Sequence, residues 1–303
     1  MFLYPQQLTT DNAIGDGRVV LCFEYDGRKF HGWQQQKSGV RSVEAELTKA
    51  VAKVADHPVE LVSAGRTDTG VHASYQVAHF ETTSIRNLRS WVMGINTALP
   101  FDIAVHWAGN STEDFHARFS ATYRRYRYII YNNQVRPGIQ RGQVSWTFRE
   151  LNAARMHEAA QALVGEHDFS AFRAAGCQSR TPVRFLEQIK VTRTGDFVVI
   201  DVQANAFVHH MVRNIAGALI AVGTGKQSAS WIRAILEGRD RTQAGVTAPS
   251  DGLYLVDVGY PGNFGIPAAE CGPGFVRPWF SRAENTPVDP THIHQKRKPM
   301  QVS

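Results

Sequence analysis

The sequence has little cysteine and no long apolar run. Its cysteines, Cys22, Cys177 and Cys271, are far apart in the chain. This spacing excludes the paired C-x-x-C units of a zinc ribbon and the dense cysteine pattern of a disulfide scaffold. The most apolar longer stretch, 215–222, is too short to cross a bilayer, and the first residues lack the basic start and apolar core of a signal peptide. We therefore expect a reduced protein of the cytoplasm.

Signatures of nucleotide-dependent and metal-dependent enzymes are also missing. The segment 223–226 is similar to a phosphate-binding loop, but it lacks the earlier glycine, and Gln227 replaces the required Ser or Thr. His157-Glu158 lacks the second histidine of a zinc protease, and no G-x-S-x-G nucleophile elbow occurs. The sequence therefore predicts no cofactor and no metal.

Positive charge is in excess. The chain has 33 Lys and Arg against 27 Asp and Glu, which gives a formal net charge of +6 and a pI of about 9.3. Such a balance is typical of proteins that bind a polyanion, with nucleic acid as the first candidate, although a solvated basic surface would give the same numbers. A hydrophobic content of 43% and a length of 303 residues suit a globular chain of two domains.

Two successive halves of the chain predict the same order of elements. In the first half we expect strands at 19–25, 61–64, 76–81 and 103–108, and helices at 42–54 and 88–99. In the second half we expect strands at 120–131, 185–192, 197–203 and 253–258, and helices at 153–164, 207–222 and 231–236. The repeated order strand, helix, strand, strand, helix, strand is the split βαβ arrangement of ferredoxin-like domains. This predicts an α+β fold with two such halves, mainly antiparallel sheets and a cleft between them.

Changes in composition suggest the boundaries. We place an N-terminal extension at 1–17, a first α+β domain at 18–114 and a second at 115–260. The remainder, 261–303, contains seven of the 13 prolines and ends in a basic run. Such a composition favours an extended or disordered tail over a third domain.

The polar segment Gly65–His72 follows a predicted strand and is bracketed by Gly65 and Gly70. A loop of this kind can present Asp68 to a cleft. The alternative is a plain turn in which the Asp68 side chain bonds to its own backbone. A metal site is a weaker alternative, because no second carboxylate lies within a few residues.

The segment Tyr123–Tyr128 interleaves arginine and tyrosine. On a strand, Arg124 and Tyr126 share one face while Arg125 and Arg127 share the other. Cations for phosphates and flat rings for bases are what an RNA groove requires. The same pattern also suits a sheet whose arginine stems cover a tyrosine core.

The segment Asn205–Asn214 opens the helix predicted at 207–222, whose apolar stripe would begin at Phe207. In that helix His209 and Arg213 lie on one face, a turn apart. The side chains of His209 and His210 would diverge by about 100°, which makes them a poor metal-binding pair. Arg213 is either a surface cation or the partner of a carboxylate across the cleft.

Several segments together resemble the TruA family of tRNA pseudouridine synthases. They occur in the family's order over roughly 19–260: Tyr25–Gly27 with Phe30, Gly32–Gln36, Gly65–Asp68, Gly70–Ala73, Phe115–Phe119, Arg125–Tyr128, Asn205–Asn214 and Gly252–Leu255. The resemblance implies that Asp68 is the catalytic nucleophile of an enzyme that cuts the C1′–N1 bond of uridine and rejoins the base through C5. Thr69 replaces the alanine more usual after the aspartate, a small departure.

The resemblance also implies a substrate and roles for further residues. The substrate would be the tRNA anticodon arm at positions 38 to 40, bound in the cleft by a homodimer. Tyr126 would stack on the flipped uracil, and Arg213 would pair with Asp68. Arg66 would fill the gap left by the base, and Leu253 would form an apolar wall of the pocket.

Two other classes of protein share some of these features. A non-catalytic RNA-binding protein with ferredoxin-like domains would explain the charge and the fold. It would not explain Asp68, because a carboxylate in a phosphate-binding cleft repels its ligand. A metal-dependent nuclease would require clustered carboxylates beside the Asp68 loop, and the sequence has none there.

Overall fold

The computed structural model describes residues 13–269 and 272–276. In this part of the chain it has five α-helices and an open ten-stranded sheet, most of whose strand pairs are antiparallel. The predicted α+β class is confirmed. No helix among these residues is long and apolar enough to cross a membrane.

The N-terminal half has the predicted order of elements. They are β1 Ala13–Ile14, β2 Gly17–Tyr25, α1 Val43–Ala55, β3 Val62–Ser63, β4 His72–Thr82, β5 Arg86–Asn87, α2 Leu88–Ala98 and β6 Ile103–Asn110. β6 pairs with β2, β2 with β4, and β4 with β3, always antiparallel. This is the split βαβ arrangement. β1 and β5 form a separate two-stranded sheet.

The C-terminal half repeats the arrangement with insertions. Its elements are β7 Tyr123–Asn132, β8 Ser145–Thr147, α3 Ala153–Ala160, β9 Gly165–Asp168, β10 Val183–Thr194, β11 Phe197–Ala204, α4 Met211–Gly223, α5 Trp231–Gly238 and β12 Leu253–Gly259. β12 pairs with β7, β7 with β11, and β11 with β10, again antiparallel. β9 extends this half at the outer edge of β10, and β8 pairs with β7.

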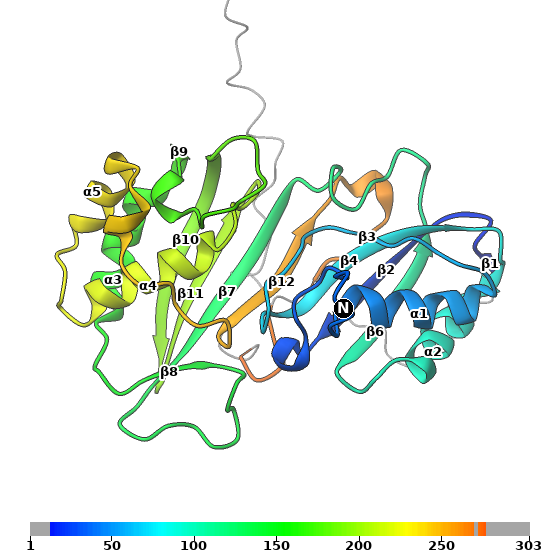
Figure 1. Cartoon of the computed structure of the whole chain (residues 1–303), viewed down its shortest axis with the longest axis horizontal. Helices are drawn as coiled ribbons and strands as arrows, with labels where there is room; N and C mark the ends of the chain where they lie inside the picture. The colour runs from blue at the N-terminus through cyan, green and yellow to red at the C-terminus, as the bar shows by residue number, and fades with distance from the viewer. Residues whose placement is uncertain (1–12, 270–271, 277–303) are drawn as a thin grey trace, which may run out of the picture.

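One strand, β12, joins the two halves into a single sheet. Along its main path the strand order is β6-β2-β4-β12-β7-β11-β10-β9. β12 runs parallel to β4, with Tyr254 opposite His72, and antiparallel to β7, with Leu253 opposite Tyr128. In Figure 1 the sheet continues through both halves, with α1 and α2 at one end and α3, α4 and α5 at the other.

Helix α1 begins one residue after its predicted start. The Ser42 side chain caps its first turn by accepting a hydrogen bond from the Ala45 N–H at 3.3 Å. Val43, Leu47 and Val51 recur at helical spacing, and all three are buried. The cap and the apolar stripe therefore position this helix against the core of the N-terminal half.

Helix α4 begins four residues later than predicted. His210 has a φ of +61° and lies just outside the helix, which starts at Met211. A left-handed residue cannot continue a right-handed helix. The prediction that Phe207 belongs to the helix, and that His209 lies one helical turn before Arg213, is therefore wrong. The rest of the apolar stripe is buried as expected: Met211, Ile215, Leu219 and Val222.

The arginine-rich strand is β7, and one of its faces points into the protein interior. Arg125 and Arg127 are 4% and 0% exposed and share the carboxylate of Asp201 on β11. Arg125 Nε and Nη2 donate to its two oxygens at 2.7 and 2.8 Å, and Arg127 Nε donates at 2.8 Å. For these two residues the structure contradicts the RNA-groove interpretation and supports a structural role.

The described part of the C-terminal segment packs on the sheet. The Phe264 ring lies 5.2 Å from that of Phe115, Gly272 lies against the Arg127 guanidinium, and Val276 is buried. The predicted extended or disordered tail covered 261–303. Of these residues, 270–271 and 277–303 lie outside the described part, as do 1–12 of the N-terminal extension.

His79 on β4 makes the stability of the fold depend on pH. Its ring is buried, and its Nδ1 accepts a hydrogen bond from the Ala117 N–H at 3.1 Å. Burial, together with smaller contributions from the nearby charges of Arg18 and His116, lowers the pKa of His79 from 6.5 to about 4. Between these two values the unfolded chain binds the proton and the folded chain does not. The free energy of unfolding must therefore fall as pH drops from 6.5 towards 4.

We expect His79→Asn to weaken this pH dependence, because the asparagine oxygen can still accept the Ala117 hydrogen bond but does not titrate. The measurement is the urea midpoint of wild type and variant at several values between about pH 4.5 and 7. The wild-type midpoint should fall more steeply with acid than that of the variant. Equal slopes would contradict the assignment to His79.

Candidate active site

Asp68 lies on the loop 64–71 between β3 and β4, and the residues around it are fixed. The Thr67 hydroxyl hydrogen bonds with the Tyr25 hydroxyl at 2.8 Å. The Thr67 carbonyl accepts from the Trp33 N–H at 3.0 Å, and the Gly65 carbonyl accepts from Gln76 Nε2 at 2.8 Å. Backbone and side-chain contacts thus hold the loop on the N-terminal side of the aspartate.

A second segment, 26–33, lies so close to this loop that two positions require glycine. A Cβ on Gly32, whose φ is +85°, would lie 2.6 Å from the Thr67 carbonyl oxygen. A Cβ on Gly27 would lie 2.0 Å from the carbonyl oxygen of Val71. Both distances are too short for a side chain. Both glycines belong to segments that carry the family resemblance.

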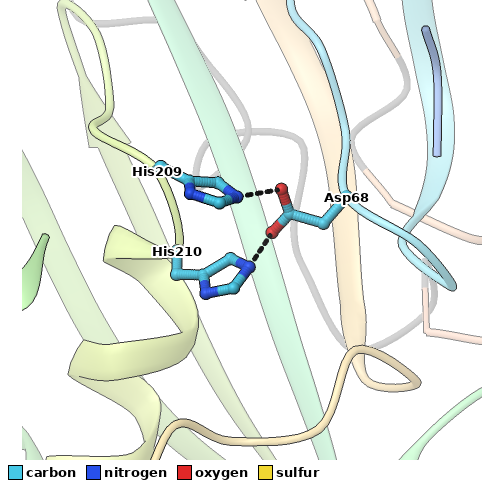
Figure 2. A group of neighbouring side chains, drawn as sticks. All are labelled: Asp68, His209 and His210. Atoms are coloured by element: carbon cyan, nitrogen blue, oxygen red, sulfur yellow. Dashed lines mark ion pairs between the residues drawn. The ribbon is translucent and has the colours of Figure 1, made fainter. Parts of the chain in front are cut away.

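The Asp68 carboxylate faces the C-terminal half. Its Oδ1 lies 3.3 Å from His209 Nε2, and its Oδ2 lies 3.3 Å from His210 Nε2 and 3.6 Å from Arg213 Nη1. Figure 2 shows both imidazole rings pointing at the two carboxylate oxygens. The carboxylate is thus directed across the sheet, as expected of a loop that presents Asp68 to the opposite half. The Asp68 side chain is 23% exposed.

The two histidines converge, contrary to expectation. Their ring centroids are 4.0 Å apart, and their Nε2 atoms and the Asp68 carboxylate form a set of possible metal ligands within 4.8 Å of one another. The predicted divergence assumed helical backbone, but the left-handed conformation of His210 turns both rings towards Asp68. Burial lowers the pKa of His210, while the Asp68 charge acts in the opposite direction.

Arg213 lies in the first turn of α4 with its guanidinium directed at Asp68. Its Nε donates to the Ala248 carbonyl at 2.9 Å, which leaves Nη1 nearest to the carboxylate. The contact of 3.6 Å between Nη1 and Oδ2 is an ion pair longer than a normal charge-assisted hydrogen bond. The structure therefore brings together the two residues that were expected to pair.

Tyr126 lies on β7, on the face opposite to Arg125 and Arg127. Its ring packs edge-on against Phe207 at 5.0 Å, and its hydroxyl is close to Gly65 at the start of the Asp68 loop. Burial raises the pKa of Tyr126, and the negative charge of Asp68 adds to the shift. An aromatic surface and a hydroxyl thus lie within the electrostatic influence of the carboxylate.

Of the two remaining predicted site residues, Arg66 is exposed and Leu253 is buried. Arg66 is exposed on the loop, two residues before Asp68, and makes no hydrogen bond or ion pair within the part of the chain described. Leu253 is buried at the start of β12. Its link to the loop is indirect: the Ser250 side chain in the preceding turn lies against Gly70.

Arg124 has a role that the sequence analysis missed. Its guanidinium donates to the carbonyl of Ala64, at the start of the Asp68 loop, at 3.0 Å. It also donates to the carbonyl of Asn205 at 3.2 Å, at the start of the segment 205–214 that contains both histidines. Arg124 therefore ties together the two segments that form the site. The alternation on β7 predicts its face, but nothing in the sequence indicates carbonyl partners from both halves.

Comparison with known proteins identifies the family of this chain. A family model described as tRNA pseudouridine synthase matches residues 21–120 and 159–261, which include the Asp68 loop and the segment 205–214. A tRNA pseudouridine synthase A of Aliivibrio fischeri (strain MJ11) is 58% identical over 259 residues, covering 86% of this chain and 98% of the relative. Proteins of the same name from Shewanella amazonensis and Coxiella burnetii are 54% identical, each covering 86% of this chain and 99% of the relative. The chain therefore belongs to the tRNA pseudouridine synthase family.

Proposed function

We propose that this tRNA pseudouridine synthase isomerises uridine at positions 38 to 40 of the tRNA anticodon arm, with Asp68 as the nucleophile. The observation that carries the proposal is the Asp68 carboxylate, which is directed from a braced loop towards Arg213 of the opposite half at 3.6 Å. A plain turn or a phosphate-binding surface has no use for a carboxylate in that position. The non-catalytic RNA-binding alternative is not favoured, because the relatives are enzymes by name.

The reaction requires no outside reactant. The C1′–N1 bond of uridine breaks, the uracil turns, and a C1′–C5 bond forms. The C5 proton leaves and N1 gains a proton, so atoms and electrons balance without oxidation or group donation. An ionised carboxylate can provide the covalent attachment and then assist removal of the C5 proton. The Arg213 guanidinium, 3.6 Å from Oδ2, places a positive charge opposite the carboxylate.

The target base must leave its stack at a cost of a few kcal/mol. Tyr126 is our candidate for the stacking partner, which would return about 1–3 kcal/mol. Arg66, exposed and without a protein partner in the described residues, is our candidate for the space that the base leaves. Leu253 would contribute an apolar wall through β12. Each of these roles follows from family position.

A basic surface would attract the tRNA to a cleft between the two halves. The net charge of +6 provides long-range attraction to phosphates. Phe119, 74% exposed, offers a flat ring with the Arg118 guanidinium 5.6 Å from its centroid. Arg118 is linked to the site because its carbonyl accepts a hydrogen bond from Arg124. We also propose a homodimer that acts in the cytoplasm, with domains at 18–114 and 115–260.

The test is pseudouridine formation in unmodified tRNA transcripts, in the presence of EDTA, mapped by position. Transcripts that carry cytidine at position 38, 39 or 40 should each lose the corresponding product and no other. Pseudouridine elsewhere would contradict the proposed substrate positions. Binding of tRNA without any pseudouridine would support the non-catalytic alternative.

A further inference from the structure

We propose that Asp68, His209 and His210 form a binding site for a divalent cation of the zinc class, and that its occupation inhibits the enzyme. The three side chains supply two imidazole nitrogens and a carboxylate from opposite halves of the sheet. Figure 2 shows the two rings, from the segment before α4, each directed at one oxygen of the Asp68 carboxylate. The inhibitory part rests on the proposed role of Asp68, whereas the binding part does not.

Two separations between donor atoms match those around a zinc-class ion, and the ligand atoms all lie within 4.8 Å of one another. Tetrahedral zinc holds nitrogen and oxygen ligands at about 2.0–2.2 Å, so that neighbouring donors lie about 3.3–3.6 Å apart. His209 Nε2 and Asp68 Oδ1 are 3.3 Å apart, and so are His210 Nε2 and Asp68 Oδ2. Both contacts are longer than a good charge-assisted hydrogen bond of about 2.7–2.9 Å.

The histidine backbone is held in place before any ion binds. The His209 N–H donates to Cys177 Sγ at 3.3 Å, and its carbonyl accepts from the Ala174 N–H at 3.0 Å. His210 keeps its left-handed conformation, and its carbonyl accepts from the Asn214 N–H at 2.9 Å. Because these bonds fix the backbone on both sides, the chain need not rearrange to present the two rings to an ion.

The chemistry of the donors selects the ion. Two imidazoles and one carboxylate suit Zn²⁺, Co²⁺ or Ni²⁺, whereas Mg²⁺ requires oxygen ligands in near-octahedral geometry. His209 is 43% exposed, so solvent can complete the coordination sphere and the ion can exchange. Arg213, 3.6 Å from Asp68 Oδ2, opposes a cation and should keep the affinity moderate.

Occupation of the site would block catalysis directly. Each carboxylate oxygen of Asp68 faces one histidine donor, so an ion among the three ligands engages the carboxylate. A carboxylate bound to a metal is a poorer nucleophile and cannot be approached by uridine on the same side. The site would therefore make the enzyme sensitive to free zinc but indifferent to magnesium.

Binding is tested first, without tRNA, by calorimetric titration of the full chain with Zn²⁺ and by the visible spectrum with Co²⁺. We expect one ion per chain in a tetrahedral environment. His209→Gln and His210→Gln should each weaken binding by at least about tenfold, the range found when support for a metal ligand is lost. His167→Gln, on β9 away from the site, is the matched control and should bind as the wild type does. Equal binding by all four proteins would overturn the site.

Inhibition is then measured as the ratio of pseudouridine formation with and without Zn²⁺, each protein being compared with its own rate in EDTA. Wild type and His167→Gln should lose most activity in Zn²⁺, recover it in excess EDTA, and keep it in Mg²⁺. His209→Gln and His210→Gln should need at least about tenfold more Zn²⁺ for the same loss. Binding without inhibition, or equal inhibition of all variants, would overturn the inhibitory role. A wild type inactive in EDTA would instead contradict the proposed function and leave the binding result standing.

Discussion

The variant Asp68→Asn should form no measurable pseudouridine while it still binds tRNA. Asparagine has the shape of aspartate but is a much weaker nucleophile, and it removes the charge that faces Arg213. Loss of a covalent catalyst lowers turnover by about 10⁴-fold or more. The basic surface that attracts tRNA is unchanged, so the dissociation constant should change by less than about tenfold.

The measurement is single-turnover conversion in an unmodified transcript, together with a binding titration at fixed salt. Thr69→Ala is the matched control, because it changes an exposed residue of the same loop, next to Asp68, and should react at the wild-type rate. An Asp68→Asn variant that retains more than about a hundredth of the activity would contradict nucleophilic catalysis by this residue.

The largest effect on stability is expected from Asp201→Ala. This carboxylate accepts hydrogen bonds from both Arg125 and Arg127 in the interior of the C-terminal half. Without it, two buried guanidinium groups lose their shared counter-charge. Removing one partner of a buried ion pair costs about 3–5 kcal/mol in the free energy of unfolding. Unfolding in urea, followed by fluorescence, measures the loss.

Glu237→Ala is the control for that experiment. Glu237 pairs with Arg233 at 3.8 Å on the surface of α5, where both side chains are about two-thirds exposed. Such exposed pairs contribute at most about 0.5 kcal/mol. If Asp201→Ala destabilised the chain no more than Glu237→Ala does, the buried cluster could not be important for stability.

Much of the fold could be predicted because its signals are local. The apolar stripe of α1 predicts a helix at 42–54, whose ends differ from the observed ones by one residue. The alternation along β7 predicts that Arg125 and Arg127 share a face. Sequence does not tell which face is covered, because that depends on Asp201 and on Gly272, far along the chain.

The candidate site was harder to predict because its residues come from distant parts of the chain. Asp68 and Arg213 are 145 positions apart, and only the family resemblance indicated that they pair. The histidines were misjudged because a helical pattern of apolar residues continued through 207–210, while the backbone adopts a left-handed turn at His210. Arg124 escaped notice because its partners are backbone carbonyls, which have no signature in a sequence.

The position of β12 near the end of the chain has a consequence for how the protein is made. On the ribosome, β4 and β7 are complete long before residues 253–259 emerge, and β12 pairs with both of them. Until then each half presents an open strand edge, a surface on which nascent chains can aggregate. Because Asp68 belongs to one half and Arg213 to the other, the proposed site can assemble only after β12, the last strand among the described residues, is released.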